Sequence, residues 1–231
     1  GRSTGGLVLD DASSFLSDRD SSAPAVSSVR RLRRIPGFSR IVLDDESWFP
    51  LTTRTTENLG IVPGFFFAPH ELEQLQAEGW RAYAYALGLD LLGRTETPAF
   101  GLRRKLIQRK VPVSAVDHAI DALQAEGSLD DRRFADSWLR VQLRSKSVSR
   151  RALLAGLRRR GVAREIAEAA VTTAFEEEPE LHEKLFRRAV DQVMSRRNMN
   201  LDKAARALLR RGFRTEQVAR WYQSEQSKLS E

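Results

Sequence analysis

Residues 106–111, which read LIQRKV, return 51 positions later as LRRRGV at 157–162 and again as LLRRGF at 208–213. Each copy begins with leucine and ends with a hydrophobic residue after basic side chains. The same shift aligns hydrophobic positions upstream, namely Tyr83, Phe134 and Leu185. A regular period of this length marks a repeated supersecondary unit. The sequence therefore predicts a helical repeat protein that works through its surface rather than through a catalytic pocket.

The predicted fold is mainly α. Three tandem three-helix repeats form an elongated array, and a small β-hairpin element precedes them in the sequence. The expected boundaries are a disordered or flexible, basic-ended tail over 1–38, a β element over 39–70, and repeats over 71–127, 128–177 and 178–231. The tail is rich in Ser, Asp, Gly and Ala and lacks apolar periodicity. Its basic end, at residues 30–34, is interpreted as a solvated linker, with a phosphate-contacting arm as the alternative.

The β element is predicted from turn residues between two apolar runs. Residues 39–43 and 48–52 read as the strands of a hairpin, with Pro50 placing the second strand at an edge. The run 65–67, three phenylalanines, is a candidate third strand. Such a small sheet must pack on a neighbour to be stable.

Helix boundaries follow from capping residues, proline and glycine. From Pro69 a long amphipathic helix is expected, with a break at Gly79. The expected later start signals are Thr97-Pro98, a capping box at Ser114, Asp130 with Asp131 in the first turn, Ser149, Pro179, Asn200 and Thr215. The expected stops include Gly127, Gly161 and Gly212.

Positive charge is concentrated in the repeats. Residues 1–78 hold 8 basic and 11 acidic side chains, a net of −3, whereas residues 79–231 hold 30 and 20, a net of +10. Such a field favours polyanions or an acidic protein surface as partners.

Several classes of protein are disfavoured. The chain has no cysteine, which excludes disulfides and thiolate zinc sites. No stretch approaches the length of a membrane span, and no signal peptide is recognised, so a cytoplasmic protein is expected. The three histidines, at 70, 118 and 182, are far apart, and phosphate-binding glycine loops do not occur. We therefore expect no catalytic residues, no metal and no cofactor.

Basic side chains recur on the second helix of each repeat and form the candidate surface for a partner or DNA. Three of the positions, Arg109, Arg160 and Arg211, are related by the 51-residue shift and have a structural alternative. A cation in the last helical turn offsets the helix dipole by roughly 0.3–1 kcal/mol. The full predicted set is Arg103, Arg104, Lys105, Arg150, Arg151, Arg158, Arg159, Arg160, Arg206, Arg210 and Arg211. Trp138 and Trp221 are expected in the core.

The run 127–135, GSLDDRRFA, precedes a basic helix that ends in Arg-Gly-Val at 160–162, and the third repeat carries ALLRRGF at 207–213. With these motifs the middle repeat resembles the RecX family of bacterial recombination regulators. The resemblance covers about residues 70–228. Departures are Lys110 at an expected glycine position and Ser147-Val148 where many members have Gly-Pro. Some members also carry a small β extension before their helices, which residues 39–72 resemble.

The resemblance implies a non-enzymatic modulator of the RecA recombinase. Family members bind along the groove of the RecA–DNA filament and mainly inhibit its ATPase, strand-exchange and co-protease activities. The implied partners are the RecA filament and single- or double-stranded DNA, with the chain acting as a monomer and without a membrane. The alternative is a direct DNA-binding helical protein of the helix-turn-helix type, in which one helix enters the major groove.

Overall fold

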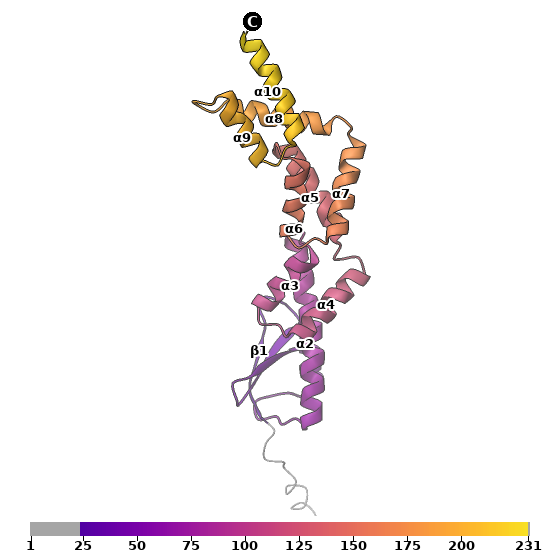
Figure 1. The fold of residues 1–231 in the computed structure, drawn as a ribbon. Helices are drawn as coiled ribbons and strands as arrows, with labels where there is room; N and C mark the ends of the chain where they lie inside the picture. The colour runs from indigo at the N-terminus through magenta and orange to yellow at the C-terminus, as the bar shows by residue number, and fades with distance from the viewer. Residues whose placement is uncertain (1–23, 231) are drawn as a thin grey trace, which may run out of the picture. The chain divides into compact units, whose positions relative to one another are not determined.

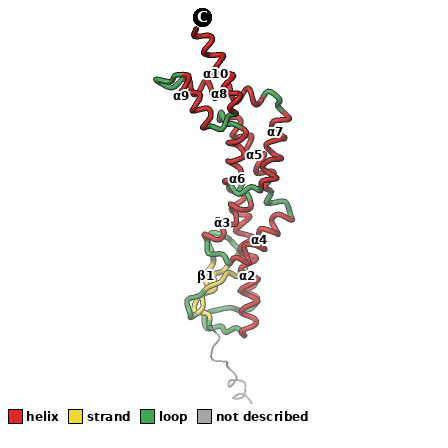
Figure 2. Tube along the Cα trace, in the orientation of Figure 1, coloured by secondary structure: helices red, strands yellow, loops and turns green. Residues whose placement is uncertain are grey.

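The computed structural model describes residues 24–230, with side chains through residue 228. The described residues divide into two compact units, with the boundary between Tyr83 and Ala84. The first unit holds the sheet and the second holds most of the helices (Figures 1 and 2). Among the described residues, no helix is both long enough and apolar enough to cross a membrane.

Three antiparallel strands form the sheet of the first unit. They are β1 (Val26–Arg31), β2 (Phe38–Leu43) and β3 (Trp48–Thr52), in the spatial order β1-β2-β3. The predicted hairpin is therefore confirmed as β2–β3, with Pro50 on an edge strand. A short helix, α1 (Thr53–Asn58), follows β3, with the Thr52 hydroxyl accepting a hydrogen bond from the Thr55 amide at 3.0 Å.

Two predictions about this unit are wrong. The tail predicted over 1–38 is ordered from Ala25 onward, because Val26–Arg31 pairs with β2; residues 1–23 lie outside the described residues. The third strand is this segment and not the phenylalanine run, of which Phe66 forms a single bridge to Ala25. The Ser27 hydroxyl, which donates to the Val42 and Leu43 carbonyls, marks a register shift in β1 that interrupts strict alternation.

Helix α2 (Pro69–Arg94) packs its first half against the sheet. Buried residues of the sheet, the following loop and α2 form one hydrophobic cluster: Val26, Ile41, Leu43, Phe49, Leu51, Ile61, Phe67 and Leu72. The predicted break at Gly79 does not occur, since the helix is continuous. A Cβ at Gly79 would lie 1.9 Å from the Pro50 carbonyl oxygen, so glycine permits close approach of β3 to the helix.

The second unit contains the three-helix repeats. The first repeat comprises the end of α2, α3 (Ala99–Gln108) and α4 (Val113–Ala125). The second comprises α5 (Asp131–Ser145), α6 (Arg150–Arg159) and α7 (Arg164–Glu177). The third comprises α8 (Leu181–Met194), α9 (Leu201–Arg210) and α10 (Thr215–Ser230). The mainly α, repetitive fold is thus confirmed.

The recurrent hexapeptide ends the second helix of each repeat in the same backbone geometry. Its fifth position has positive φ: Lys110 at 61°, Gly161 at 85° and Gly212 at 83°. In each case the next amide donates to the carbonyl of the first leucine of the hexapeptide, as from Val162 to Leu157 at 3.2 Å. This is the Schellman motif, in which a hydrophobic residue beyond the turn packs on the last helical turns. The period therefore repeats a helix stop together with its core contacts.

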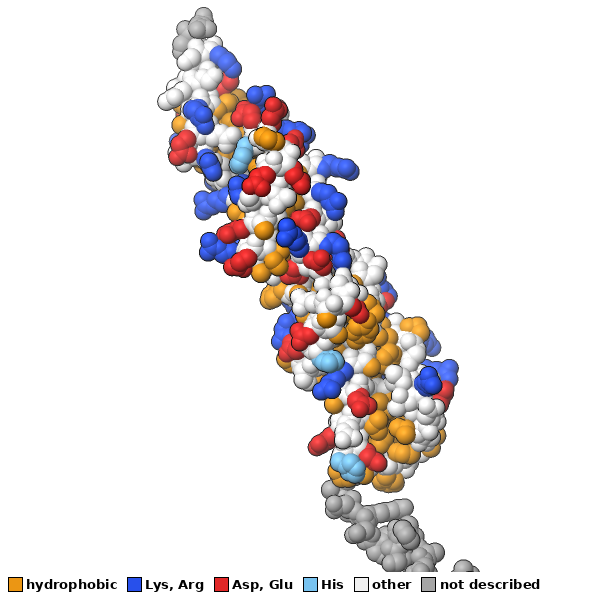
Figure 3. All heavy atoms as spheres, turned by 90° about the vertical axis from the view of Figure 1, so that its right-hand side faces the viewer, with side chains coloured by type: hydrophobic (Ala, Val, Ile, Leu, Met, Phe, Trp, Pro, Cys, Tyr) orange, Lys and Arg blue, Asp and Glu red, His pale blue; other side chains and the backbone are white. Residues whose placement is uncertain are grey.

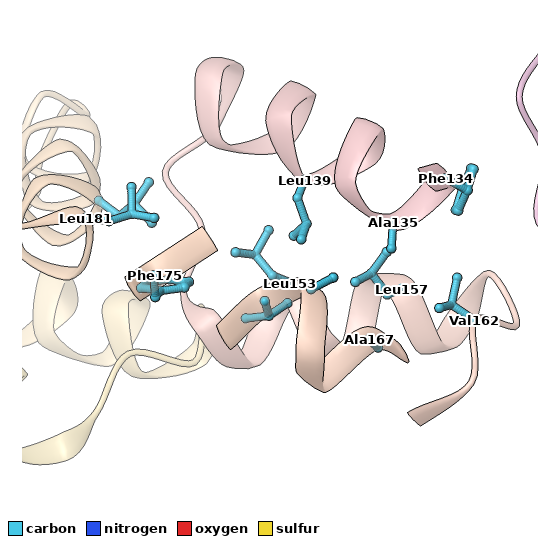
Figure 4. Close-up of a cluster of buried hydrophobic side chains, with 12 residues drawn as sticks. Phe134, Ala135, Leu139, Leu153, Leu157, Val162, Ala167, Phe175 and Leu181 are labelled. Atoms are coloured by element: carbon cyan, nitrogen blue, oxygen red, sulfur yellow. The ribbon is translucent and has the colours of Figure 1, made fainter. Parts of the chain in front are cut away.

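Each repeat is held together by leucines and alanines facing inward. In the second repeat, Figure 4 shows side chains from α5, α6 and α7 converging, with Leu181 of α8 at one end. Leu153 and Leu157 of α6 are 1% and 0% exposed. Truncating such a leucine to alanine costs about 2–5 kcal/mol. Trp138 packs against this cluster and Trp221 against the cluster of the third repeat, as predicted.

Three helix starts that a side chain caps were predicted correctly, whereas α1, which Thr52 caps, was not predicted. Asp130 accepts from the amides of Arg132 and Arg133, Ser149 accepts from Ala152, and Asn200 accepts from Lys203.

Three other predicted starts are wrong. Helix α3 follows Pro98, and the Thr97 hydroxyl instead accepts from Lys105 Nζ at 2.8 Å. Helix α4 begins at Val113 after Pro112, so Ser114 lies inside the first turn and makes no capping box. Helix α8 begins at Leu181, two residues beyond Pro179. Pro98 and Pro112 precede their helices in extended backbone, with ψ of 163° and 140°. Pro179 instead lies in a turn, in which the Leu181 amide donates to the Glu178 carbonyl at 2.8 Å.

Candidate partner-binding surface

The arginines that follow the 51-residue shift are held by the protein itself. Arg109 donates to the Lys105 carbonyl at 2.8 Å, and Arg160 donates to the Gly156 carbonyl at 2.9 Å. These two bonds are equivalent, and both occur at helix C-caps. Arg160 also lies over the Trp138 ring at 4.8 Å. The structural interpretation of these positions is therefore supported.

Arg211, the third member of this class, is also engaged. Its guanidinium donates to Gln192 Oε1 at 3.0 Å, and burial followed by the nearby Arg196 lowers its pKa. Its backbone carbonyl accepts a hydrogen bond from the Ser149 hydroxyl at 2.7 Å, which links the second and third repeats. Arg211 thus contributes to packing as well as to surface charge.

Three further predicted residues have partners within their own repeat. Arg103 forms an ion pair with Asp117, and Lys105 binds the Thr97 hydroxyl. Arg150 donates to the Thr172 hydroxyl at 2.6 Å and lies 5.7 Å from the Phe175 ring centroid. Arg103 and Lys105 are therefore less available to a partner than their charge alone suggests.

The remaining six predicted residues have exposed side chains with no ion pair or side-chain hydrogen bond in the part of the chain that the structure describes. They are Arg104, Arg151, Arg158, Arg159, Arg206 and Arg210. Holding no internal acceptor, their guanidinium groups can bind carboxylates or phosphates of a partner without first breaking a bond. The space-filling view shows Lys and Arg interspersed with Asp and Glu, so the charge on that face is mixed (Figure 3).

The structure brings only some of these residues together. Arg150, Arg151 and Arg158 line one cavity between the second and third repeats. Arg214 lines the same cavity but was not predicted, because it follows the second helix of its repeat rather than lying on it. Arg210 and Arg211 line a separate hollow with Lys146. The cavity is thus the densest gathering of predicted residues.

Neighbouring repeats in the second unit meet at equivalent glycines. A Cβ at Gly161 would lie 2.3 Å from Phe100 Cβ, and one at Gly212 would lie 3.5 Å from Arg151 Cβ. Phe100 and Arg151 are themselves related by the 51-residue shift. Each helix stop therefore rests on the start of the second helix in the preceding repeat. This contact couples the backbone turn to the position of the basic helices.

Catalytic chemistry has no evident centre among the described residues. His70, His118 and His182 remain separate, and no group of three or more potential metal-ligating side chains occurs there. The His182 ring packs against the Phe175 ring, with centroids 4.3 Å apart and ring planes tilted by 42°. Burial, then the charges of Arg214 and Arg150, lower the pKa of His182. The histidine is thus part of the cationic cavity rather than of an acid–base pair.

Comparisons with known proteins agree with the repeat architecture. Residues 130–171 match the family model described as "RecX, second three-helix domain". The regulatory protein RecX of Treponema pallidum (strain Nichols) is 37% identical over 137 residues, which span 59% of this chain and 82% of that protein. The regulatory protein RecX of Thermobifida fusca is 33% identical over 109 residues, or 47% of this chain and 55% of that protein.

Two solved structures share the fold. A crystal structure of regulatory protein RecX has a TM-score of 0.62 at 20% identity, covering 87% of this chain and 99% of its own. The structure of RecX from Lactobacillus salivarius has a TM-score of 0.55 at 17% identity, covering 63% and 96%. Since the Treponema relative is matched over most of its length, the chain belongs to the RecX family of regulatory proteins.

Proposed function

We propose that this chain is a cytoplasmic, monomeric regulator that binds the RecA filament on DNA and inhibits its ATPase, strand-exchange and co-protease activities. Membership in the RecX family is the observation that carries the proposal. The chain acts by binding and not by turnover. Its candidate contact residues are the basic side chains of α3, α6 and α9, of which the six without internal partners are the strongest.

Separated basic helices suit a partner with repeated subunits. Exposed charges accelerate association and set orientation more than they add affinity. Contacts on one chain reinforce each other, because the first contact raises the effective concentration of the next. Arg158 and Arg159 on α6 and Arg206 and Arg210 on α9 offer two such contacts on successive repeats.

The test is charge reversal of Arg158 and Arg159. Both side chains are exposed and hold no internal partner, so the double variant to Glu retains the fold. We omit Arg160, whose stacking on Trp138 stabilises the repeat. With RecA ATPase on single-stranded DNA as the assay, the variant requires about tenfold more protein for half-maximal inhibition.

The matched control is Arg132→Glu with Arg140→Glu on α5 of the same repeat. It makes the same change in net charge at exposed positions outside the second helix. The control inhibits as the unmodified chain does. Equal inhibition by both folded double variants and the unmodified chain removes α6 from the contact surface.

Direct DNA binding is the second candidate, because unpartnered arginines recognise phosphates as readily as carboxylates. A module that binds DNA by itself loses affinity steeply with salt and retains sequence preference at higher salt. Tight binding to bare DNA, unaffected by adding RecA, favours this function over the first.

A further inference from the structure

The junction between the first and second repeats contains an internal carboxylate. Asp131, the first residue of α5, accepts a hydrogen bond from the Ala99 amide at 2.7 Å. Ala99 is the first residue of α3, whose N-cap Pro98 supplies no side-chain bond. A carboxylate at a helix N-terminus satisfies a free amide and interacts favourably with the helix dipole.

The equivalent place in the next junction lacks that carboxylate. Adding 51 converts Asp131 to His182 and Ala99 to Arg150. His182 is therefore the sequence equivalent of Asp131, one residue further into its helix, and the start of α6 has the Ser149 hydroxyl as its cap. Instead of an acidic side chain, the junction has a cavity of about 610 Å³, within the size range of ligand sites.

The cavity has an apolar wall and a cationic rim. Val148, Leu154 and Ala155 are partly exposed on the wall. The charged lining residues are Arg150, Arg151, Arg158, His182, Arg214 and Glu216. The lining therefore contains one carboxylate, that of Glu216, and four guanidinium groups. Positive charge in excess of the local negative charge favours an anionic occupant.

The arginines are placed to accept that occupant. Arg150 is held by the Thr172 hydroxyl and the Phe175 ring, so its guanidinium is fixed before any ligand arrives. Arg158 and Arg214 have no ion pair among the described residues. Arginine binds carboxylates through paired, charge-assisted hydrogen bonds, which are stronger than neutral ones.

The apolar wall distinguishes a peptide from a nucleic acid. Phe175 and Phe213 are 7% and 8% exposed, so neither presents an open ring face on which a base could stack. The exposed parts of the wall are aliphatic, which suits an apolar side chain of a peptide. An acidic segment with one apolar residue among its carboxylates complements both wall and rim.

We propose that the cavity between the second and third repeats binds an acidic peptide segment of a protein partner, one carboxylate occupying the place that Asp131 fills in the preceding junction. A neighbouring apolar side chain lies on Val148, Leu154 and Ala155. The inference does not depend on RecA being the partner, since a synthetic peptide suffices to test it.

The most direct test is a variant in which the chain itself carries a carboxylate at position 182. His182→Asp places an acidic group at the position equivalent to Asp131, where it competes with the peptide. His182→Asn is the matched control, because it also removes the ring contact with Phe175 but adds no charge. Binding to the Asp variant is weaker than binding to the Asn variant by about tenfold.

The assay is NMR titration of the full isotope-labelled chain with an acetylated Glu-Asp-Phe-Asp-Glu peptide. Amide shifts of Gly212, Thr215 and Arg150 follow binding, and a Lys-Lys-Phe-Lys-Lys peptide leaves them unchanged. Arg214→Gln weakens binding of the acidic peptide. Equal binding by the Asp and Asn variants, shifts confined to other surfaces, or no shift at millimolar peptide overturns the proposal.

Discussion

Gly161→Ala tests the contact that joins the first and second repeats. The residue has a φ of 85°, a left-handed conformation that costs an L-residue about 1–2 kcal/mol. The new Cβ would also lie 2.3 Å from both Cβ and Cγ of Phe100. Because Phe100 Cβ is fixed by the backbone of α3, relief requires movement of a helix, and overpacking of this kind costs about 1–3 kcal/mol. The expected total loss of stability is about 2–5 kcal/mol.

Gly127→Ala is the control for this prediction. Gly127 has a φ of 77°, yet nothing lies within 4 Å of the position of its added Cβ. It therefore incurs only the backbone cost of about 1–2 kcal/mol. Urea unfolding followed by circular dichroism gives both values. Equal losses for the two variants would refute the view that close approach of the repeats selects glycine at 161.

Three further predictions concern single side chains, each checked by the urea midpoint. Lys110→Gly relieves a left-handed lysine and stabilises the protein by about 1 kcal/mol; a lower midpoint contradicts this. Asp131→Ala removes the hydrogen bond from the Ala99 amide and lowers the free energy of unfolding by about 1 kcal/mol. An unchanged midpoint would show that Asp131 does not stabilise the start of α3. Burial, and then the charges of Arg214 and Arg150, lower the pKa of His182 in the folded protein below its ordinary value of 6.5. Its contribution to stability is therefore fully present above pH 6.5 and is lost as the pH falls through the pKa of the folded state. His182→Asn reduces this acid-side loss, and an identical pH profile rules out the histidine as its source.

Much of the helical fold is predictable because the 51-residue period repeats chemistry as well as spacing. The leucine, the left-handed position and the following hydrophobic residue recur together, so their joint role as a helix stop can be inferred without coordinates. Strand β1 was missed for the opposite reason. Its residues alternate poorly, and a register shift between Val26 and Ser28 interrupts the pattern of period two.

The site was harder to predict because its decisive contacts cross between repeats. The sequence separates arginines that recur with the 51-residue period from those that do not. The hydrogen bonds that Arg109 and Arg160 donate to carbonyls of their own helices agree with a structural role for the recurring class. It did not reveal that Asp131 reaches Ala99, 32 positions earlier, or that Arg214 joins the α6 arginines. Such pairs depend on how helices of adjacent repeats pack, which residue spacing within one helix does not specify.

Binding of the fluorescently labelled chain to RecA filaments on single-stranded DNA, compared with bare DNA at the same salt, tests the central claim most directly. The proposed regulator binds the filament at least about tenfold more tightly than bare DNA, and Arg158→Glu with Arg159→Glu weakens the filament complex. Equal or tighter binding to bare DNA would contradict the account and identify a DNA-binding module instead.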